Sequence, residues 1–167
     1  RPHECLRRLV WRRTGGEVID GPLKGLKLTP ELHRVHTAYL LGTYEREIAG
    51  PIEHICELDR PLVIDVGSSF GYYAVGIPRR NETAEVIAYE MMPEARELLA
   101  GMIEANGVGE RVEVRGECRR ADLQADLERS APARVVICDC EGAEIMLLDP
   151  LRVPGLAAAH VLVEVHE

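Results

Sequence analysis

Five short strand-like runs alternate with stretches of helical period after residue 61. The runs lie at residues 62–66, 85–90, 111–114, 134–138 and 160–166. Continuous apolar runs such as the first are typical of strands buried on both faces, as in a parallel sheet. Alternation of strands with helices implies right-handed crossovers, which place helices on both faces of the sheet. We therefore predict an α/β fold whose parallel strands, numbered along the chain, lie in the order 3-2-1-4-5.

The helical stretches between these runs have recognisable boundaries. Residues 72–77 favour a helix that Pro78 and Asn81 bring to an end. Residues 93–106 carry a proline in the first turn and Asn-Gly at the end, both typical of helix boundaries. Residues 121–129 are also predicted to be helical.

The first 58 residues have a different pattern. We predict an amphipathic helix at residues 1–13 and a small hairpin at 18–28, where apolar and polar residues alternate around turn residues. Residues 39–58 favour one longer helix, which Pro51 starts or kinks. Because 58 residues are too few to hold a core of their own, we expect an N-terminal cover on a domain of residues 59–167.

Composition and charge narrow the function classes. A chain of 167 residues with 46% hydrophobic content is expected to form one structural unit. The net charge of −8 disfavours a nucleic-acid-binding surface. Five cysteines without framework spacing indicate a reducing compartment, so we expect a cytoplasmic protein. No apolar run approaches the ~20 residues of a membrane span, so no membrane partner is expected.

A glycine-rich turn follows the first run, with the pattern Asp-x-Gly-x-x-x-Gly at residues 65–71. Gly67 and Gly71 supply backbone freedom and allow a ligand to approach closely. The amides at the following helix start favour a polar or anionic group. A dinucleotide fingerprint has glycine where Asp65 stands. A carboxylate there repels a pyrophosphate but helps to hold a cationic, amino-acid-bearing ligand.

An acid also ends the second run, because Glu90 lies 23 residues after Gly67. A carboxylate in this place can accept hydrogen bonds from both ribose hydroxyls of an adenosine ligand. Residues just past the third strand lie beside the adenine in adenosine-binding members of this architecture. We therefore expect Glu117 to accept from the adenine amino group and Cys118 to line the ring edge.

Candidate catalytic residues follow the fourth and fifth runs. Asp139 and Glu141 come at the carboxyl end of a central strand, beside the topological switch point. They are suited to orient a substrate hydroxyl, to take its proton or to hold a divalent cation. His166 is a candidate general base near the same crevice. Cys138 and Cys140 favour packing over metal ligation, since two thiols alone make no site, and we predict no metal centre.

Together these motifs resemble the FkbM-type branch of the class I S-adenosylmethionine-dependent methyltransferases. The run Asp-x-Glu-Gly-Ala-Glu at residues 139–144 is the most specific of them. The matching segments are residues 42–47, 63–73, 87–90, 138–144 and 163–166. The resemblance implies a Rossmann-like sheet and methyl transfer from S-adenosylmethionine to an oxygen, commonly a sugar or natural-product hydroxyl. It implies cofactor contacts at Asp65, Gly67, Ser68, Glu90 and Glu117.

The chain departs from the family pattern in two places. Ser68-Ser69 stand where the family usually has a small residue and asparagine. The class I sheet normally continues past a fifth strand, whereas this chain stops at Glu167, so we expect the C-terminal strands to be missing. The strand at 160–166 would then expose a sheet edge, which favours pairing with a second copy unless missing residues cover it. Because the chain starts at Arg1 rather than Met, we also expect an upstream piece to be absent.

Two other functions stay open at this point. One is a nicotinamide-dependent oxidoreductase, which Asp65 disfavours because it replaces the first glycine of the fingerprint. The other is a non-catalytic domain that binds S-adenosylmethionine or adenosine. For a methyltransferase, Asp139 or His166 is the candidate base and Glu141 the residue that orients the acceptor.

Overall fold

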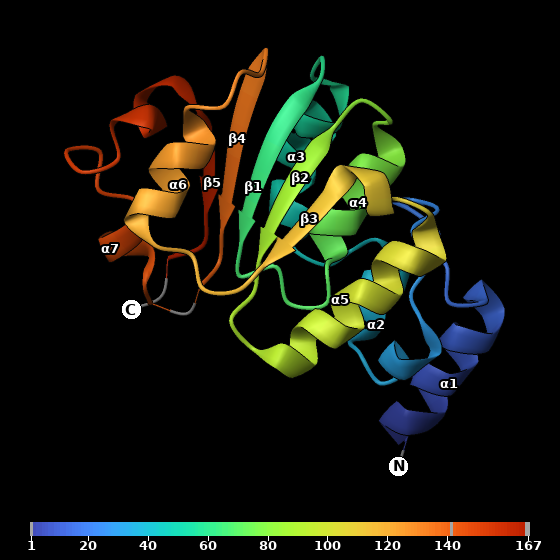
Figure 1. Ribbon diagram of the computed structural model, residues 1–167. Helices are drawn as coiled ribbons and strands as arrows, with labels where there is room; N and C mark the ends of the chain where they lie inside the picture. The colour runs from blue at the N-terminus through green and yellow to red at the C-terminus, as the bar shows by residue number, and fades with distance from the viewer. Residues whose placement is uncertain (1, 141, 166–167) are drawn as a thin grey trace.

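The computed structural model describes residues 2–140 and 142–165. These residues contain one five-stranded parallel sheet in the order β3-β2-β1-β4-β5, which confirms the predicted architecture (Figure 1). The strands are β1 (Pro61–Val66), β2 (Glu85–Tyr89), β3 (Val112–Arg115), β4 (Ala133–Cys138) and β5 (His160–Val163). The fifth strand is thus shorter than predicted, and its last four expected residues lie outside any described strand.

The topological switch point lies between β1 and β4. From β1 the chain adds β2 and β3 on one side, and it then crosses over to add β4 and β5 on the other. The last residue of β1, Val66, pairs with Tyr89 of β2 and with Cys138 of β4. Because this register aligns the carboxyl ends of three strands, the residues that follow each strand meet at one edge of the sheet.

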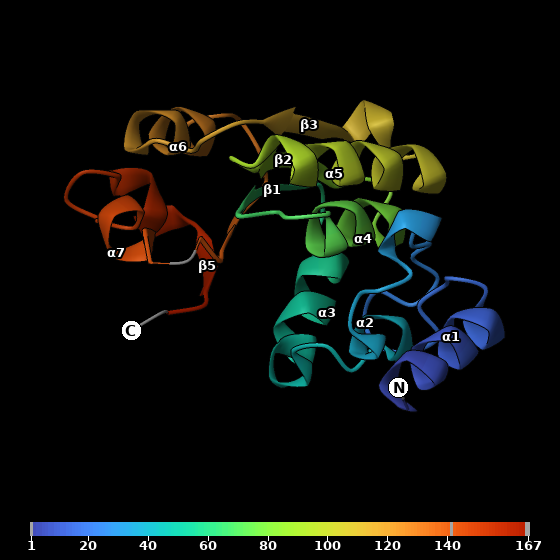
Figure 2. The same ribbon diagram turned by 90° about the horizontal axis from the view of Figure 1, so that it is seen from below.

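Helices connect the strands and precede them. The α-helices are α1 (Pro2–Thr14), α2 (Thr37–Leu41), α3 (Ala49–Glu57), α4 (Tyr72–Arg80), α5 (Pro93–Asn106), α6 (Arg120–Leu127) and α7 (Glu144–Leu147). Short 3₁₀ turns are η1 (Pro30–Leu32), η2 (Arg46–Ile48), η3 (Gly109–Arg111) and η4 (Pro154–Ala158). Figure 2 shows α6 and α7 on one side of the sheet and α3 and α4 on the other, as the crossovers predict.

Each face of the sheet has its own hydrophobic core. Val63 and Val135 pack in a cluster with residues of α3, α4 and α5. Ile64 and Val136, the next residues along the same strands, pack in a second cluster with residues of α6 and α7. Neighbouring strand residues thus face opposite cores, which explains why β1 is buried at every position. Buried residues from the first 57 positions, among them Leu40, belong to the first cluster.

Two expectations for the N-terminal segment are wrong. The predicted hairpin has only one bridge among its described residues, between Glu17 and Lys27, because the intervening residues form tight turns. The predicted helix over residues 39–58 is broken into α2, η2 and α3. The break lies where Gly42 and Glu45 both take left-handed backbone conformations, which an α-helix does not allow. Pro51 lies in the first turn of α3, where its missing N–H costs no helical hydrogen bond.

Candidate functional site

Two adjoining cavities open at the carboxyl ends of the strands. The larger cavity has a volume of about 680 Å³ and the smaller cavity about 360 Å³, both in the range of small-molecule sites. The larger cavity is lined by residues that follow β2, β3 and β4. The smaller cavity is lined by residues 44–48, by the loop after β1 and the start of α4, and by residues 162–165.

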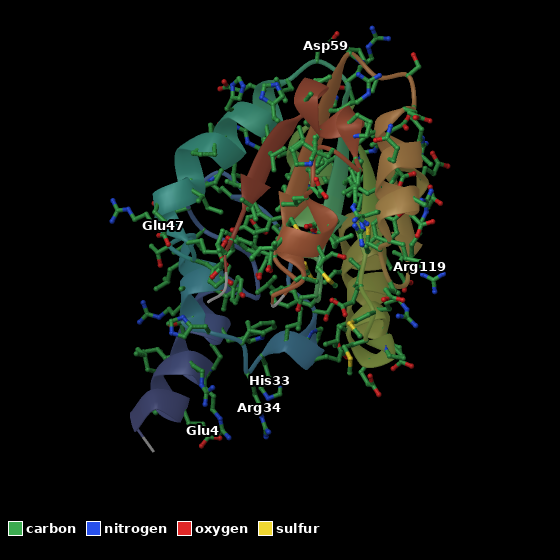
Figure 3. All side chains as sticks on the ribbon, turned by 90° about the vertical axis from the view of Figure 1, so that its left-hand side faces the viewer. Glu4, His33, Arg34, Glu47, Asp59 and Arg119 are labelled. Carbon is green, nitrogen blue, oxygen red and sulfur yellow. The ribbon has the colours of Figure 1, made fainter. Side chains whose placement is uncertain are left out.

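Five residues line both cavities and therefore mark the place where they meet. These are Tyr39, Tyr44, Gly67, Ser69 and Asp139. In Figure 3, Arg119 of the larger cavity and Glu47 of the smaller cavity lie on opposite sides of the view. The sheet places this junction directly beyond β1 and β4, at the switch point.

The glycine loop is fixed by the backbone around it. The amides of Gly67 and Ser68 both donate to the carbonyl of Tyr89, at 2.9 and 3.0 Å. Gly67 has a φ of +87°, and a Cβ atom there would lie 1.7 Å from the carbonyl oxygen of Asp139. The close approach that the sequence predicts at Gly67 is thus, in the first place, an approach of β4's backbone rather than of a ligand. Gly67 also lines both cavities.

Gly71, a predicted cofactor residue, has a different place. It caps the N-terminus of α4 with a φ of +94°, and a Cβ atom there would lie 2.4 Å from a methyl carbon of Leu99. It lines neither cavity. The structure therefore gives Gly71 a packing role between α4 and α5.

Glu90 joins the end of β2 to the glycine loop. Its carboxylate is buried and accepts hydrogen bonds from the amide of Ser69 at 2.9 Å and from the amide of Met92 at 2.7 Å. Each carboxylate oxygen has a second lone-pair site, so two amide bonds leave acceptor capacity on both oxygens. Glu90 also lines the larger cavity, as predicted for a residue that contacts a ligand there.

Ser69 is a site residue that sequence reasoning missed. Its φ of +48° is left-handed, which is uncommon for a residue other than glycine. The bond from its amide to Glu90 holds it in this conformation, at the junction of the cavities. Asparagine tolerates the left-handed region better than most residues. The departure from the family's asparagine in this loop was therefore the signal for it.

Asp65 is a fully buried carboxyl that lines the smaller cavity. Burial, with a further contribution from the nearby charge of Asp139, raises its pKa to about 7. A hydrogen bond from the backbone of Ala74 acts in the opposite direction, and Glu90 adds a smaller increase. The buried acid at this position is thus poised to change its charge near neutral pH.

We expect Asp65→Asn to remove a pH dependence of stability. An acid whose pKa rises from 3.8 to about 7 on folding keeps its proton in the native state while the unfolded chain loses it. Its contribution to stability is therefore full below pH 4, falls as pH rises, and is lost above pH 7. Wild type and variant should match near pH 4, and at pH 8 the variant should be more stable by about 2–4 kcal/mol. Urea unfolding between pH 4 and 8 measures this.

Asp59→Asn is the matched control for this experiment. Asp59 is an exposed aspartate that lies far from the cavities in Figure 3. Its substitution should shift the stability of the protein by a similar small amount at every pH. Parallel stability curves for wild type and Asp65→Asn would show that the folded protein does not shift the pKa of Asp65.

The predicted catalytic residues are only partly within the described structure. Asp139 lines both cavities, and its amide extends the strand ladder by donating to the carbonyl of Val66 at 3.0 Å. Glu141 and His166 lie outside the described residues. Glu144, which ends the same motif, is buried and accepts hydrogen bonds from the amides of Cys140 and Gly142. It therefore shapes the loop after Asp139.

Glu117 and Cys118 both line the larger cavity, where the sequence places them. The Glu117 side chain is exposed and lies 3.7 Å from the guanidinium of Arg119. The thiol of Cys118 is half-buried, and this burial raises its pKa to about 12. Cys138 and Cys140 have their sulfur atoms 3.6 Å apart, and the five cysteines are free thiols.

An aromatic wall in the smaller cavity is the second feature that the sequence did not reveal. It consists of Tyr39, Tyr44, Phe70, Tyr72 and Tyr73. The rings of Tyr39 and Tyr44 stack with centroids 3.9 Å apart, and Tyr72 contacts both of them edge-on. Residues 42–47 belong to a motif of the resemblance, which gave them no role. The only local signal was the concentration of tyrosines around two glycine turns.

Two searches of the described structure gave negative results. Its His, Cys, Asp and Glu side chains form no group of three or more that could hold a metal ion. None of its helices combines the length and the apolar character that crossing a membrane requires.

Comparison with known proteins shows the fold. No protein-family model matches the chain, and no curated protein is detectably similar to it in sequence. A solved structure of a Klebsiella pneumoniae protein, provisionally assigned as an O-methyltransferase, is 14% identical with a TM-score of 0.51. The alignment covers 98% of this chain and 64% of that one.

A second similar structure is the O-methyltransferase TomG of Streptomyces achromogenes, involved in tomaymycin synthesis and solved in complex with S-adenosylmethionine. It is 20% identical with a TM-score of 0.51, over 83% of this chain and 66% of that one. This chain thus spans just under two thirds of the length of either structure. The described residues therefore have the Rossmann-like fold of the class I methyltransferases, with the strand order 3-2-1-4-5.

Proposed function

We propose that this protein is an S-adenosylmethionine-dependent methyltransferase that methylates a hydroxyl group of a small molecule. The observation that carries the proposal is the junction of two cavities at Gly67, Ser69 and Asp139, beyond the carboxyl ends of β1 and β4. A transferase needs a cofactor and an acceptor to meet at one point, and the two cavities provide such a point. The finer assignment to the FkbM-type branch is part of the proposal and is supported by the motifs quoted above.

The residues of the larger cavity fit the cofactor. Glu90 keeps acceptor capacity for the ribose hydroxyls after it binds two backbone amides. Glu117 and Cys118 would lie along the adenine, and the carboxylates of Asp65 and Asp139 would face the positively charged methionine end. When bound, S-adenosylmethionine supplies a methyl group on a sulfonium centre, which an acceptor oxygen can attack in line. TomG, one of the similar structures, is solved with this cofactor.

Asp139 is the residue that we assign to the reacting hydroxyl. It lines both cavities, so its carboxylate is within the space that an acceptor oxygen would occupy. It would orient that hydroxyl and take its proton as the oxygen attacks. The aromatic wall and Leu162 would exclude water from the smaller cavity. Positioning by these residues contributes most of the rate increase in such a displacement. Glu141 and His166 are further candidates for the same work.

The decisive experiment is a calorimetric titration with S-adenosylhomocysteine and, in parallel, with NAD. We expect S-adenosylhomocysteine to bind and NAD to give no heat, since a pyrophosphate would lie against buried carboxylates. Binding of NAD alone would overturn the proposal in favour of an oxidoreductase. A methyl-transfer assay with labelled S-adenosylmethionine and a mixed panel of hydroxyl acceptors then tests turnover. Cofactor binding without turnover, with any acceptor, would identify a non-catalytic binding domain.

We further propose that the protein acts in the cytoplasm as an enzyme of small-molecule substrates. Five free thiols support a reducing compartment. The net charge of −8 disfavours nucleic acid as the acceptor. The edge of β5 exposes Val161 and Val163, so we keep pairing of two copies along this edge as part of the proposal.

A further inference from the structure

The smaller cavity has a one-sided charge. Five of its lining residues are acids, namely Glu45, Glu47, Asp65, Asp139 and Glu164. Among the described residues that line it, none is lysine, arginine or histidine. The larger cavity differs, because Arg119 and Arg120 accompany its acids. The imbalance is thus a property of the acceptor side and is not shared by the whole cleft.

The same cavity holds most of the protein's aromatic side chains. Four of the five tyrosines and the single phenylalanine line it. Aromatic faces attract cations through the ring quadrupole, and carboxylates attract them by charge. The two features together form a surface suited to a cation with an apolar or ring-shaped body.

Glu45 is the acid that the fold fixes most firmly in this cavity. Its carboxylate accepts a hydrogen bond of 2.5 Å from the hydroxyl of Tyr73, 28 residues away in the chain. Its backbone has a φ of +44°, a left-handed conformation that costs a non-glycine residue about 1–2 kcal/mol. Strain of this kind persists where the surrounding structure holds it, and it is concentrated at ligand sites. The bond to Tyr73 leaves acceptor capacity on both carboxylate oxygens of Glu45.

The cofactor does not account for these acids. S-adenosylmethionine carries an ammonium, a sulfonium and a carboxylate, so it brings a net charge of about +1 at neutral pH. The smaller cavity alone offers several carboxylates, and Glu90 and Glu117 add to them on the cofactor side. With the cofactor in place, the space left for the acceptor therefore keeps a negative potential.

We propose that the acceptor carries a protonated amine as well as the hydroxyl that is methylated, and that Glu45 binds this ammonium group. The inference rests on the proposed function and names the substrate class of the same site. An ammonium at Glu45, among the tyrosines, would leave the hydroxyl at Asp139. There the oxygen–carbon bond forms while the carbon–sulfur bond breaks, sulfur keeps the electron pair, and the hydroxyl proton passes to Asp139. Anionic acceptors would be repelled by the same acids.

Matched probes test this inference in the presence of saturating S-adenosylhomocysteine. Tyramine, 4-methylphenol and 4-hydroxyphenylacetate share a phenol but differ in charge, and glucosamine and glucose form a second pair. We expect calorimetry to show that each amine binds at least about tenfold more tightly than its neutral counterpart, and that 4-hydroxyphenylacetate does not bind. The preference should shrink as salt is raised. Equal affinities within both sets, tighter binding of the anion, or no binding of either amine at 10 mM, a concentration of order Kd for weak ligands, would overturn the inference.

Variants locate the effect. Glu45→Gln keeps an oxygen for the Tyr73 hydroxyl but removes the charge, so the preference for amines should fall to about twofold or less. Glu57→Gln makes the same change on the exposed face of α3, away from both cavities, and should keep the full preference. Affinity for S-adenosylhomocysteine is measured in every variant. If it is absent in wild type, the proposed function fails; if it is intact while the preference survives Glu45→Gln, only the present inference fails.

Discussion

Replacing Glu90 with alanine is expected to weaken S-adenosylmethionine binding by at least about a hundredfold. Two charge-assisted hydrogen bonds to the ribose would be lost, each worth roughly 1.5–3 kcal/mol. The structure adds a second cause, because the same carboxylate holds the amides of Ser69 and Met92. Without it, the glycine loop loses its tie to the end of β2. Calorimetric titration with the cofactor measures the effect, and circular dichroism checks that the variant is folded.

The control and the contrary result for Glu90 are also defined by the structure. Glu97→Ala removes an exposed glutamate from α5 and should leave cofactor affinity unchanged. Glu90→Gln should fail almost as badly as Glu90→Ala, since glutamine would set its NH₂ group against one of the two backbone amides that the carboxylate now accepts. Wild-type affinity in Glu90→Ala would place the cofactor somewhere other than the larger cavity.

The second large effect is expected from Gly67→Ala, which should prevent stable folding. The new Cβ atom would lie 1.7 Å from the carbonyl oxygen of Asp139, and 2.7 Å from its carbonyl carbon. Both neighbours are backbone atoms of the residue that follows β4, so relief requires β1 and β4 to separate at their carboxyl ends. Core disruptions above about 4 kcal/mol are a large part of a domain's typical 5–15 kcal/mol of stability. Thermal unfolding and soluble yield are the measurements.

Gly107→Ala separates the steric clash from the backbone strain. Gly107 also has a left-handed φ, +64°, but a Cβ atom there meets no other atom within 4 Å. Its substitution should therefore cost only about 1–2 kcal/mol of conformational strain. If Gly67→Ala lost no more stability than this, the close contact between the loop and the end of β4 would be refuted.

How far the sequence determined the fold can be judged from the strands. A strand buried on both faces must be apolar along its whole length, so β1 was visible as residues 62–66 without any knowledge of its neighbours. Turn residues and the alternation with helices then indicated a parallel sheet. The acid at Glu90 was also predictable, because the end of a strand is a local feature and its distance from the glycine loop is a count along the chain.

The N-terminal segment shows where local pattern was insufficient. Residues 39–58 have enough apolar positions for one helix, but the chain turns at Gly42 and at Glu45. Gly42 approaches the carbonyl of Asp20 so closely that a Cβ atom would lie 1.9 Å from it. This contact joins residues that lie far apart in sequence, and periodicity carries no information about such contacts.

The sequence by itself therefore determined the sheet, the glycine loop and the acid after β2, since each depends on local burial or local backbone conformation. Only the tertiary structure decided what surrounds them. It brings Asp139 beside Asp65 and so raises the pKa of that buried acid. It sets Tyr73 against Glu45 across 28 residues, and it turns the close approach at Gly67 into a contact with β4. These effects depend on distances between atoms of different elements, which packing fixes and local sequence does not.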